Sequence, residues 1–288
     1  MQGTVEGFSY GLVTPLVAYV MACLGGALGL RCTTRALLVG GPGRPGWLAL
    51  GSMAIASGVW TMHFIGMMGF TVQEAPIHYD KPMTYASLGV AVLMVGVGIF
   101  IVGYRGASGT ALFTGGTVTG LGIASMHYLG MAGLRLDGKL EYNTVTVAAS
   151  VLIAMVAATA ALWAAGQVRG VLWSVGASLV MGLAVSGMHY TGMAAVKVHL
   201  HGTADPATGD SPAALLAPML IGPLALLCLA GVVVLFDPLM IMGRPASPRP
   251  EHKPGVPAHA PLPHQTRRPA LRTRRLPARS RFRTPQNR

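Results

Sequence analysis

One short phrase occurs three times in this chain, as Met62-His63-Phe64-Ile65-Gly66-Met67, Met126-His127-Tyr128-Leu129-Gly130-Met131 and Met188-His189-Tyr190-Thr191-Gly192-Met193. The histidines are 64 and then 62 residues apart, a spacing that accommodates two membrane-spanning helices with their connections. In each copy a histidine precedes a methionine by four residues, so on a helix both lie on one face, one turn apart. The sequence therefore predicts three repeats, each presenting an imidazole and a thioether.

The composition is that of an integral membrane protein. Hydrophobic residues make up 52% of the chain, charged residues make up 10%, and the mean hydropathy is +0.55, whereas a soluble domain has about 25% charged residues. The net charge of +12 arises almost wholly from residues 244–288, which hold twelve Lys/Arg and one acid. Because the rest of the chain is close to neutral, the high isoelectric point does not indicate a specific nucleic-acid-binding protein.

Seven apolar stretches each approach the ~20 residues needed to cross the hydrocarbon core of a bilayer. They extend over about residues 8–30, 47–70, 84–104, 110–134, 144–166, 171–196 and 213–236. We therefore expect an all-α membrane protein with seven transmembrane helices, built from three two-helix repeats plus one closing helix. The predicted domains are a short outer N-terminus (1–7), a seven-span membrane domain (8–236) and a basic, Pro/Arg-rich, disordered cytoplasmic tail (237–288).

Basic residues predict the orientation of the spans. The connecting loops carry nearly equal numbers of Lys and Arg on the two sides, but Arg244, Arg249 and Lys253 follow closely after the last span. A cytoplasmic C-terminus after seven spans places the N-terminus outside, and the three phrase histidines then lie about 24–27 Å along a core of about 30 Å, near the outer surface. We also expect the basic tail to contact anionic lipid headgroups, at ~1 kcal/mol per nearby basic residue.

The repeats predict where the phrase residues meet. Because each repeat contains two spans, successive repeats keep the same topology and can be related by an axis along the membrane normal. Three copies around such an axis would bring three histidines into one layer and three methionines into the layer above. Thioethers favour Cu(I), and imidazole suits copper, zinc or iron. A copper site is therefore predicted, and a non-covalent haem held by two of the histidines is the alternative.

The phrase resembles the signature of the MHYT domain family, which recurs in alternate helices of a seven-span bacterial membrane module. The resemblance covers about residues 8–236, and only the third copy spells the signature in full, as Met188-His189-Tyr190-Thr191. It implies a sensory module of the bacterial cell membrane that binds copper near the outer face and responds to redox state or a diatomic gas. The metal ligands that it implies are Met62, His63, Met67, Met126, His127, Met131, Met188, His189 and Met193.

Many members of that family carry a cyclase, phosphodiesterase, kinase or DNA-binding domain after the membrane module. Here about 50 residues rich in Pro and Arg follow the last span, and such a segment cannot bury the core of a catalytic domain. We therefore expect no enzymatic activity in this chain, and signalling through an unknown cytoplasmic partner.

Other functions for the phrase remain open. A histidine inside a span can serve as an interhelical hydrogen-bonding group, with the glycine of each phrase as a packing residue, but ionisable groups inside membranes are rare and usually functional. The same ligands would also suit a copper-handling transporter or a metal-binding membrane chaperone, although the inner halves of the phrase-bearing spans offer few soft ligands. The remaining candidate ligands are assigned solvated or packing roles: His78, His199, His201, Cys23, Cys32 and Cys228.

Overall fold

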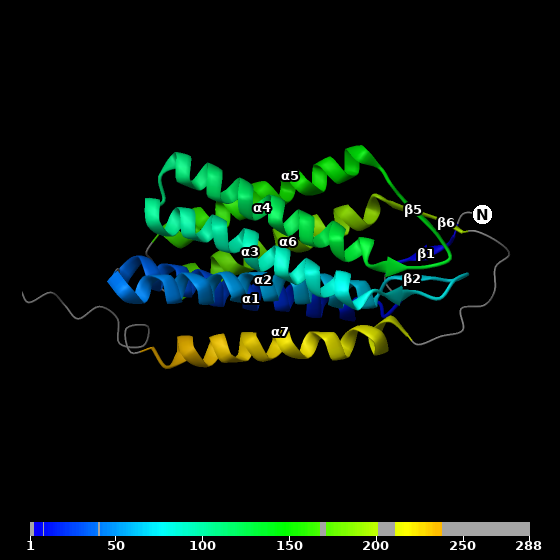
Figure 1. Ribbon diagram of the computed structural model, residues 1–288, viewed down its shortest axis with the longest axis horizontal. Helices are drawn as coiled ribbons and strands as arrows, with labels where there is room; N and C mark the ends of the chain where they lie inside the picture. Colours follow the sequence, from blue (N-terminus) through cyan, green and yellow to red (C-terminus); the bar gives the residue numbers. More distant parts are fainter. Residues whose placement is uncertain (1–2, 8, 40, 168–170, 201–210, 238–288) are drawn as a thin grey trace, which may run out of the picture. The chain divides into compact units, whose positions relative to one another are not determined.

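The computed structural model describes residues 3–7, 9–39, 41–167, 171–200 and 211–237, which all belong to one compact unit, residues 1–243. Seven α-helices lie in these residues: α1 (Val13–Val39), α2 (Arg44–Met68), α3 (Lys81–Arg105), α4 (Gly109–Ala132), α5 (Thr144–Gly166), α6 (Val171–Ala194) and α7 (Pro212–Leu235). They run side by side along the long axis of the bundle (Figure 1). Six of these seven are long and apolar enough to cross a membrane. The predicted all-α membrane protein is therefore confirmed.

Helix α4 is the one that is less apolar than the others. Its 24 residues are long enough to span, but their many glycines and threonines lower its mean hydropathy. Five of those glycines are buried, Gly115, Gly116, Gly120, Gly122 and Gly130, and α4 packs between α3 and α5. Small residues at these positions allow close contact between helices, which is how helices associate inside a bilayer.

Six helices form a closed ring of three hairpins. The hairpins are α1–α2, α3–α4 and α5–α6, and they meet through α2–α3, α4–α5 and α1–α6. Helix α2 also contacts α4 and α6, and it is the most deeply buried of the candidate spans. Helix α7 packs outside the ring against α1 and α2. The helix predicted to close the bundle thus covers one face of it, and the ring itself closes between α1 and α6.

Short strands, which the sequence analysis did not predict, tie each hairpin together at one end of the bundle (Figure 1). The antiparallel pairs are β1 (Val5–Glu6) with β2 (Thr71–Val72), β3 (His78–Tyr79) with β4 (Leu134–Arg135), and β5 (Gly138–Tyr142) with β6 (Val196–Leu200). Each pair joins the residues just before a hairpin to the residues just after it. The repeat is therefore strand–helix–helix–strand, and β1 makes part of the predicted N-terminal segment 1–7 an integral part of the body.

The same backbone hydrogen bond recurs in all three repeats at this strand end. The N–H groups of Ser9, Asp80 and Asn143 donate to the carbonyls of Gly69, Gly133 and Ala195 at 3.1, 2.8 and 2.9 Å. Each acceptor lies six residues after a phrase histidine. The three phrase-bearing helices α2, α4 and α6 are therefore held at equivalent depths relative to their partner helices.

Asp80 shows how one of these helices begins. Its carboxylate caps α3 by accepting a hydrogen bond from the N–H of Met83 at 3.0 Å, and it also accepts one from the guanidinium of Arg135 at 3.2 Å. These two donors hold the pKa of the Asp80 carboxyl below its usual value. The ion pair fixes the start of α3 against β4, on the same face of the bundle end.

The opposite end of the bundle differs from the prediction in two ways. Helix α1 continues beyond Leu30 to Val39, because nothing in the sequence breaks it before the Gly41-Pro42 turn of the short helix η1 (Gly41–Gly43). The guanidinium of Arg35 forms an ion pair with Asp237; the Asp237 side chain is buried and the Arg35 side chain is 12% exposed. Asp237, predicted to start the tail, therefore belongs to the membrane body, and the rest of the predicted disordered tail lies outside the described residues.

Close contact between α1 and α2 gives a test of the packing. A Cβ added at Gly58 would lie 2.6 Å from the Cα of Gly25, and this backbone cannot move without separating the helices. We expect Gly58→Ala to lower the free energy of unfolding by about 1–3 kcal/mol, measured by thermal unfolding in lipid nanodiscs. Gly89→Ala in α3 is the matched control, because a Cβ there meets no atom within 4 Å. Equal stability of the two variants would contradict the packing.

Candidate metal centre

The three phrase histidines converge at one point inside the bundle. They lie on α2, α4 and α6, each five residues before the last residue of its helix. The Nδ1 atoms of His63 and His189 are 3.0 Å apart, those of His63 and His127 are 3.1 Å apart, and those of His127 and His189 are 3.4 Å apart. All three side chains are at most 1% exposed. The predicted single histidine layer is thus present in the structure.

Hydrogen bonds cannot satisfy this cluster. A neutral imidazole carries one N–H, so each Nδ1 is either a donor or an acceptor. With three mutual neighbours, at least one contact must set two donors or two acceptors against each other. The Nε2 atoms of His63 and His127 are also buried and have no hydrogen-bond partner among the described residues. Unpaired buried polar groups are costly, and in native structures they often mark a functional site or an absent ion.

The spacing of the nitrogens fits ligands of one metal ion. With metal–nitrogen bonds of ~2.0–2.1 Å, three imidazole nitrogens on one ion lie roughly 3.3–3.5 Å apart. The three observed Nδ1 separations, 3.0–3.4 Å, are close to that range. Among the described residues, these three histidines form a group whose ligand atoms lie within 4.8 Å of one another, close enough to hold one ion. The donor set, three neutral imidazoles in an apolar setting, suits copper or zinc.

An aromatic ring follows each histidine and packs against it edge-on. The ring centroids are 4.6 Å apart for His63–Phe64 and 4.8 Å apart for both His127–Tyr128 and His189–Tyr190, with interplanar angles of 73–79°. Phe64 makes the same contact as the two tyrosines. The aromatic ring, and not the phenol, is therefore the shared element of the three copies.

The six phrase methionines lie in the same hydrophobic core as the residues around the histidines. Five of them are at most 1% exposed and Met193 is partly buried: Met62, Met67, Met126, Met131, Met188 and Met193. The structure thus brings the three histidines into mutual contact and encloses the methionines in the surrounding core. The methionines stay predicted ligands.

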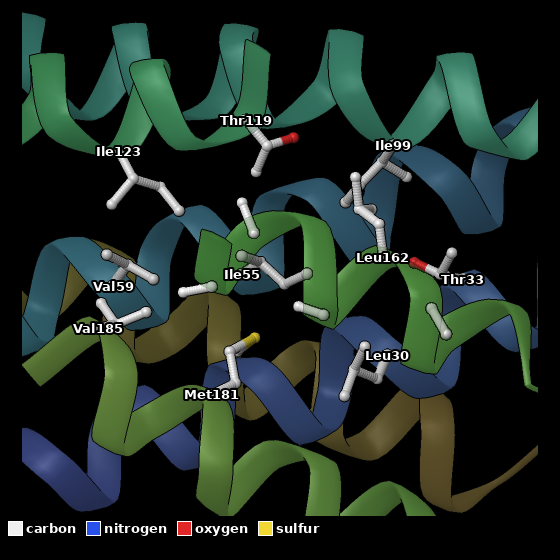
Figure 2. A pocket seen from close by; sticks show the side chains of 14 residues that line it. Leu30, Thr33, Ile55, Val59, Ile99, Thr119, Ile123, Leu162, Met181 and Val185 are labelled. Carbon is white, nitrogen blue, oxygen red and sulfur yellow. The ribbon is translucent and has the colours of Figure 1, made fainter. Parts of the chain in front are cut away.

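A small apolar cavity lies on the side of the histidines away from the strands. The residues one and two turns before the three histidines line it: Val59, Ile123, Val185, Ile55, Thr119 and Met181. Figure 2 shows these side chains, from α2, α4 and α6, around the cavity. Its volume of about 20 Å³ exceeds the ~10–15 Å³ that one water needs, but so apolar a lining favours a dry cavity.

The other candidate ligands lie apart from this cluster. His78 is exposed, and the Nε2 of His199 lies 3.2 Å from the Glu141 carboxylate in an exposed pair. His201 lies outside the described residues. Cys32 is buried, Cys23 is half-buried and Cys228 is exposed, and all three are free thiols. The exposure of His78 and His199 agrees with the predicted solvated roles, and the burial of Cys32 agrees with a packing role, whereas Cys228 is exposed and is not the buried residue predicted.

Replacing one histidine by an apolar residue of similar volume separates a packing role from a binding role. We expect His127→Leu to leave the melting temperature of the metal-free protein unchanged or raised, because it removes a buried Nε2 that has no partner among the described residues. The measurement is thermal unfolding by circular dichroism, beside the wild type. A clear loss of stability would identify His127 as a packing residue.

The sequence of this chain matches a known protein family. The family model described as "MHYT: Bacterial signalling protein N terminal repeat" matches residues 57–115, 120–178 and 182–239. Each matched segment starts in the helix that carries a phrase histidine; the first two continue into the next hairpin, and the third continues into α7. The three matches therefore follow the same threefold repeat that the strands, the hydrogen bonds and the histidines show.

Curated proteins of bacterial signalling are similar to this chain. The bifunctional diguanylate cyclase/cyclic di-GMP phosphodiesterase MucR of Pseudomonas aeruginosa is 38% identical over 197 residues, which is 67% of this chain and 29% of MucR. The cyclic di-GMP phosphodiesterase NbdA of the same organism is 35% identical (67% and 25%), and the signaling protein YkoW of Bacillus subtilis is 29% identical (66% and 24%). No solved structure matches the chain. The similarity thus spans less than a third of the length of each of these relatives.

Proposed function

This chain belongs to the MHYT family of bacterial signalling protein N-terminal repeats, and from that premise we propose that it is a membrane sensory module whose ligand is a copper ion held by His63, His127 and His189. The observation that carries the proposal is the contact of three buried Nδ1 atoms at 3.0–3.4 Å. Without a cation at least one of the three Nδ1 contacts is unsatisfied; with one, all three Nδ1 lone pairs are used.

The residues of the chain prepare this site in three ways. The bundle excludes water from the imidazoles, the edge-on aromatic rings restrict their rotation, and the strand pairs hold their helices at one depth. Bound copper would supply a centre that changes between two oxidation states. The buried methionines favour the soft Cu(I) state and would complete the ligand set.

A haem does not fit the described arrangement. Two histidines that ligate one haem must lie on opposite faces of a macrocycle, whereas here each pair of imidazoles is in direct contact and the third fills the remaining side. A single ion needs no such space. The geometry therefore favours copper over haem.

Sensing is favoured over transport by the cavity next to the histidines. A transporter would need polar or soft groups along the axis on both sides of the site. The next two layers on the side away from the strands consist of three β-branched residues, Val59, Ile123 and Val185, and then of Ile55, Thr119 and Met181. The three β-branched side chains offer an ion no ligand, and of these six side chains only Thr119 and Met181 carry a polar or soft atom. A lining this apolar admits a small apolar molecule, which supports a response to a diatomic gas.

We expect the signalling output of the module to come from an unknown cytoplasmic partner protein. Relatives are named for cyclic di-GMP synthesis or breakdown, and the similarity covers less than a third of them. We expect the described body to bind its ligand and not to catalyse a reaction. The Arg35–Asp237 ion pair joins α1 to the chain two residues after the end of α7, so a change of helix packing would reach the segment that follows. Residues 244–288 would then lie at the anionic cytoplasmic surface of the cell membrane.

The metal is tested by loading and by substitution. We expect one copper per chain, and loss of most of the affinity on replacing any one of His63, His127 or His189 by Ala, because the ligands act as a set. Replacing Met67, Met131 or Met193 by Leu should preserve folding and weaken Cu(I) more than Cu(II). On the purified protein, elemental analysis measures the copper content per chain and chelator competition measures the copper affinity.

Three independent coppers per chain would contradict a shared site. If protein purified from its native host contains zinc and not copper, the assigned ion changes and the proposed redox function is removed.

The orientation is tested by cysteine accessibility. In a background without the native cysteines, we expect an impermeant thiol reagent to label Gln73→Cys at the strand end in intact cells, after any outer envelope has been permeabilised, and Ser108→Cys only after lysis. Both positions are exposed, and Ser108 makes no side-chain cap hydrogen bond at the start of α4. The basic residues that follow the last span favour this orientation, whereas the loops carry nearly equal numbers of Lys and Arg on the two sides. The reverse labelling pattern would place the histidines near the cytoplasmic side.

A further inference from the structure

The glycine of each phrase faces an imidazole of a different helix. A Cβ added at Gly66 would lie 2.5 Å from the Nε2 of His189, one added at Gly130 would lie 2.7 Å from the Nε2 of His63, and one added at Gly192 would lie 2.4 Å from the Nε2 of His127. In all three cases the nearest atom is this ring nitrogen. No real Cβ approaches another heavy atom so closely, so any larger residue would displace the imidazole.

These three contacts form a closed cycle. The imidazole of α2 rests on the glycine of α4, that of α4 rests on the glycine of α6, and that of α6 rests on the glycine of α2. Each glycine lies three residues after the histidine of its own helix, which puts both on neighbouring positions of one face. Every helix therefore presents one imidazole and receives another.

The contact differs from the packing of Gly25 against Gly58 between α1 and α2. At Gly25 and Gly58 the nearest atoms to an added Cβ belong to the backbone of the facing helix, as expected where small residues only bring two helices together. At the three phrase glycines the nearest atom belongs to a proposed metal ligand. The space left by the missing Cβ is occupied by the Nε2 edge of that ligand.

A ring whose Nε2 edge rests on a neighbouring helix must direct its other nitrogen elsewhere. In all three histidines that nitrogen, Nδ1, faces the centre of the cluster. We propose that Gly66, Gly130 and Gly192 are positioning residues that select Nδ1 of each histidine as the metal ligand and lock the three rings into one interdependent set. The proposal rests on the proposed metal site for its functional meaning, whereas the interlocking itself exists without the ion.

The metal-dependent part is tested with single substitutions. We expect Gly66→Ala, Gly130→Ala and Gly192→Ala each to lower the copper affinity by about 10–100-fold, as supporting residues of metal sites do, and to change the ligand-nitrogen pattern in the electron paramagnetic resonance spectrum of the Cu(II) form. Gly187→Ala is the matched control: it lies in α6, two residues before His189, and its Cβ meets no atom within 4 Å. It should change neither affinity nor spectrum.

The interlocking is tested without metal by double-substitution cycles. Gly66→Ala should lower the melting temperature of the metal-free protein, and this loss should largely disappear when His189 is also replaced by Ala, since the space is then free. The same relief should not appear with His127→Ala, whose imidazole rests on Gly192. The pairs Gly130 with His63 and Gly192 with His127 should behave in the same way as Gly66 with His189.

The positioning role and the cyclic interlocking can be overturned separately. Parent-like affinity and spectra in the three Gly→Ala variants would overturn the positioning role, and equal coupling of Gly66 to His127 and to His189 would overturn the cyclic interlocking. If the parent protein binds no copper but the predicted double variants still recover their melting temperature, the interlocking is confirmed. Its role in ligand selection is then removed, and the proposed function is contradicted.

Discussion

Three imidazole nitrogens in mutual contact cannot all be paired by hydrogen bonds, and the Nδ1 atoms of His63, His127 and His189 face this constraint at 3.0–3.4 Å, away from water. A sequence selected for stability alone would fill this layer with apolar side chains, because a buried polar cluster without partners destabilises the fold. The bundle instead holds the three rings in place with an aromatic neighbour for each and with a glycine opposite each Nε2. The local cost in stability is the physical argument that the cluster binds something, and a cation is the ligand that uses three converging lone pairs.

The repeat architecture is what makes a three-ligand site from one short phrase. Each strand–helix–helix–strand unit supplies one imidazole, and the closed ring of hairpins turns three units into three equivalent positions. The recurring hydrogen bond six residues after each histidine keeps the helices in register. Since each ring rests on the next helix, a movement of one imidazole acts on all three helices. Helix α7, packed on α1 and α2 and followed by the ion-paired Asp237, lies where such a movement would reach the segment that follows.

Much of this arrangement could be predicted from the sequence, for identifiable reasons. The spacing of the histidines fixed the repeat, and the even number of spans per repeat placed His63, His127 and His189 in one layer. The strands could not be foreseen, because Val5–Glu6 and Thr71–Val72 are too short to show a pattern and their pairing is between distant segments. The end of α1 was misplaced because Arg35 looked like a loop charge, whereas a distant acid, Asp237, neutralises it inside the bundle. The role of Gly66 required the position of His189 on another helix, which no local pattern contains.

The most direct test of the shared site is X-ray absorption spectroscopy at the copper edge on protein loaded with one equivalent of Cu(I). We predict three imidazole nitrogens at ~2.0 Å from a single copper, with any methionine sulfur as an additional, longer contact, and the loss of this nitrogen shell in a variant that lacks His127. A copper bound only by sulfur, or by one imidazole with the same spectrum in the His127 variant, would contradict the convergence of the three histidines on one ion.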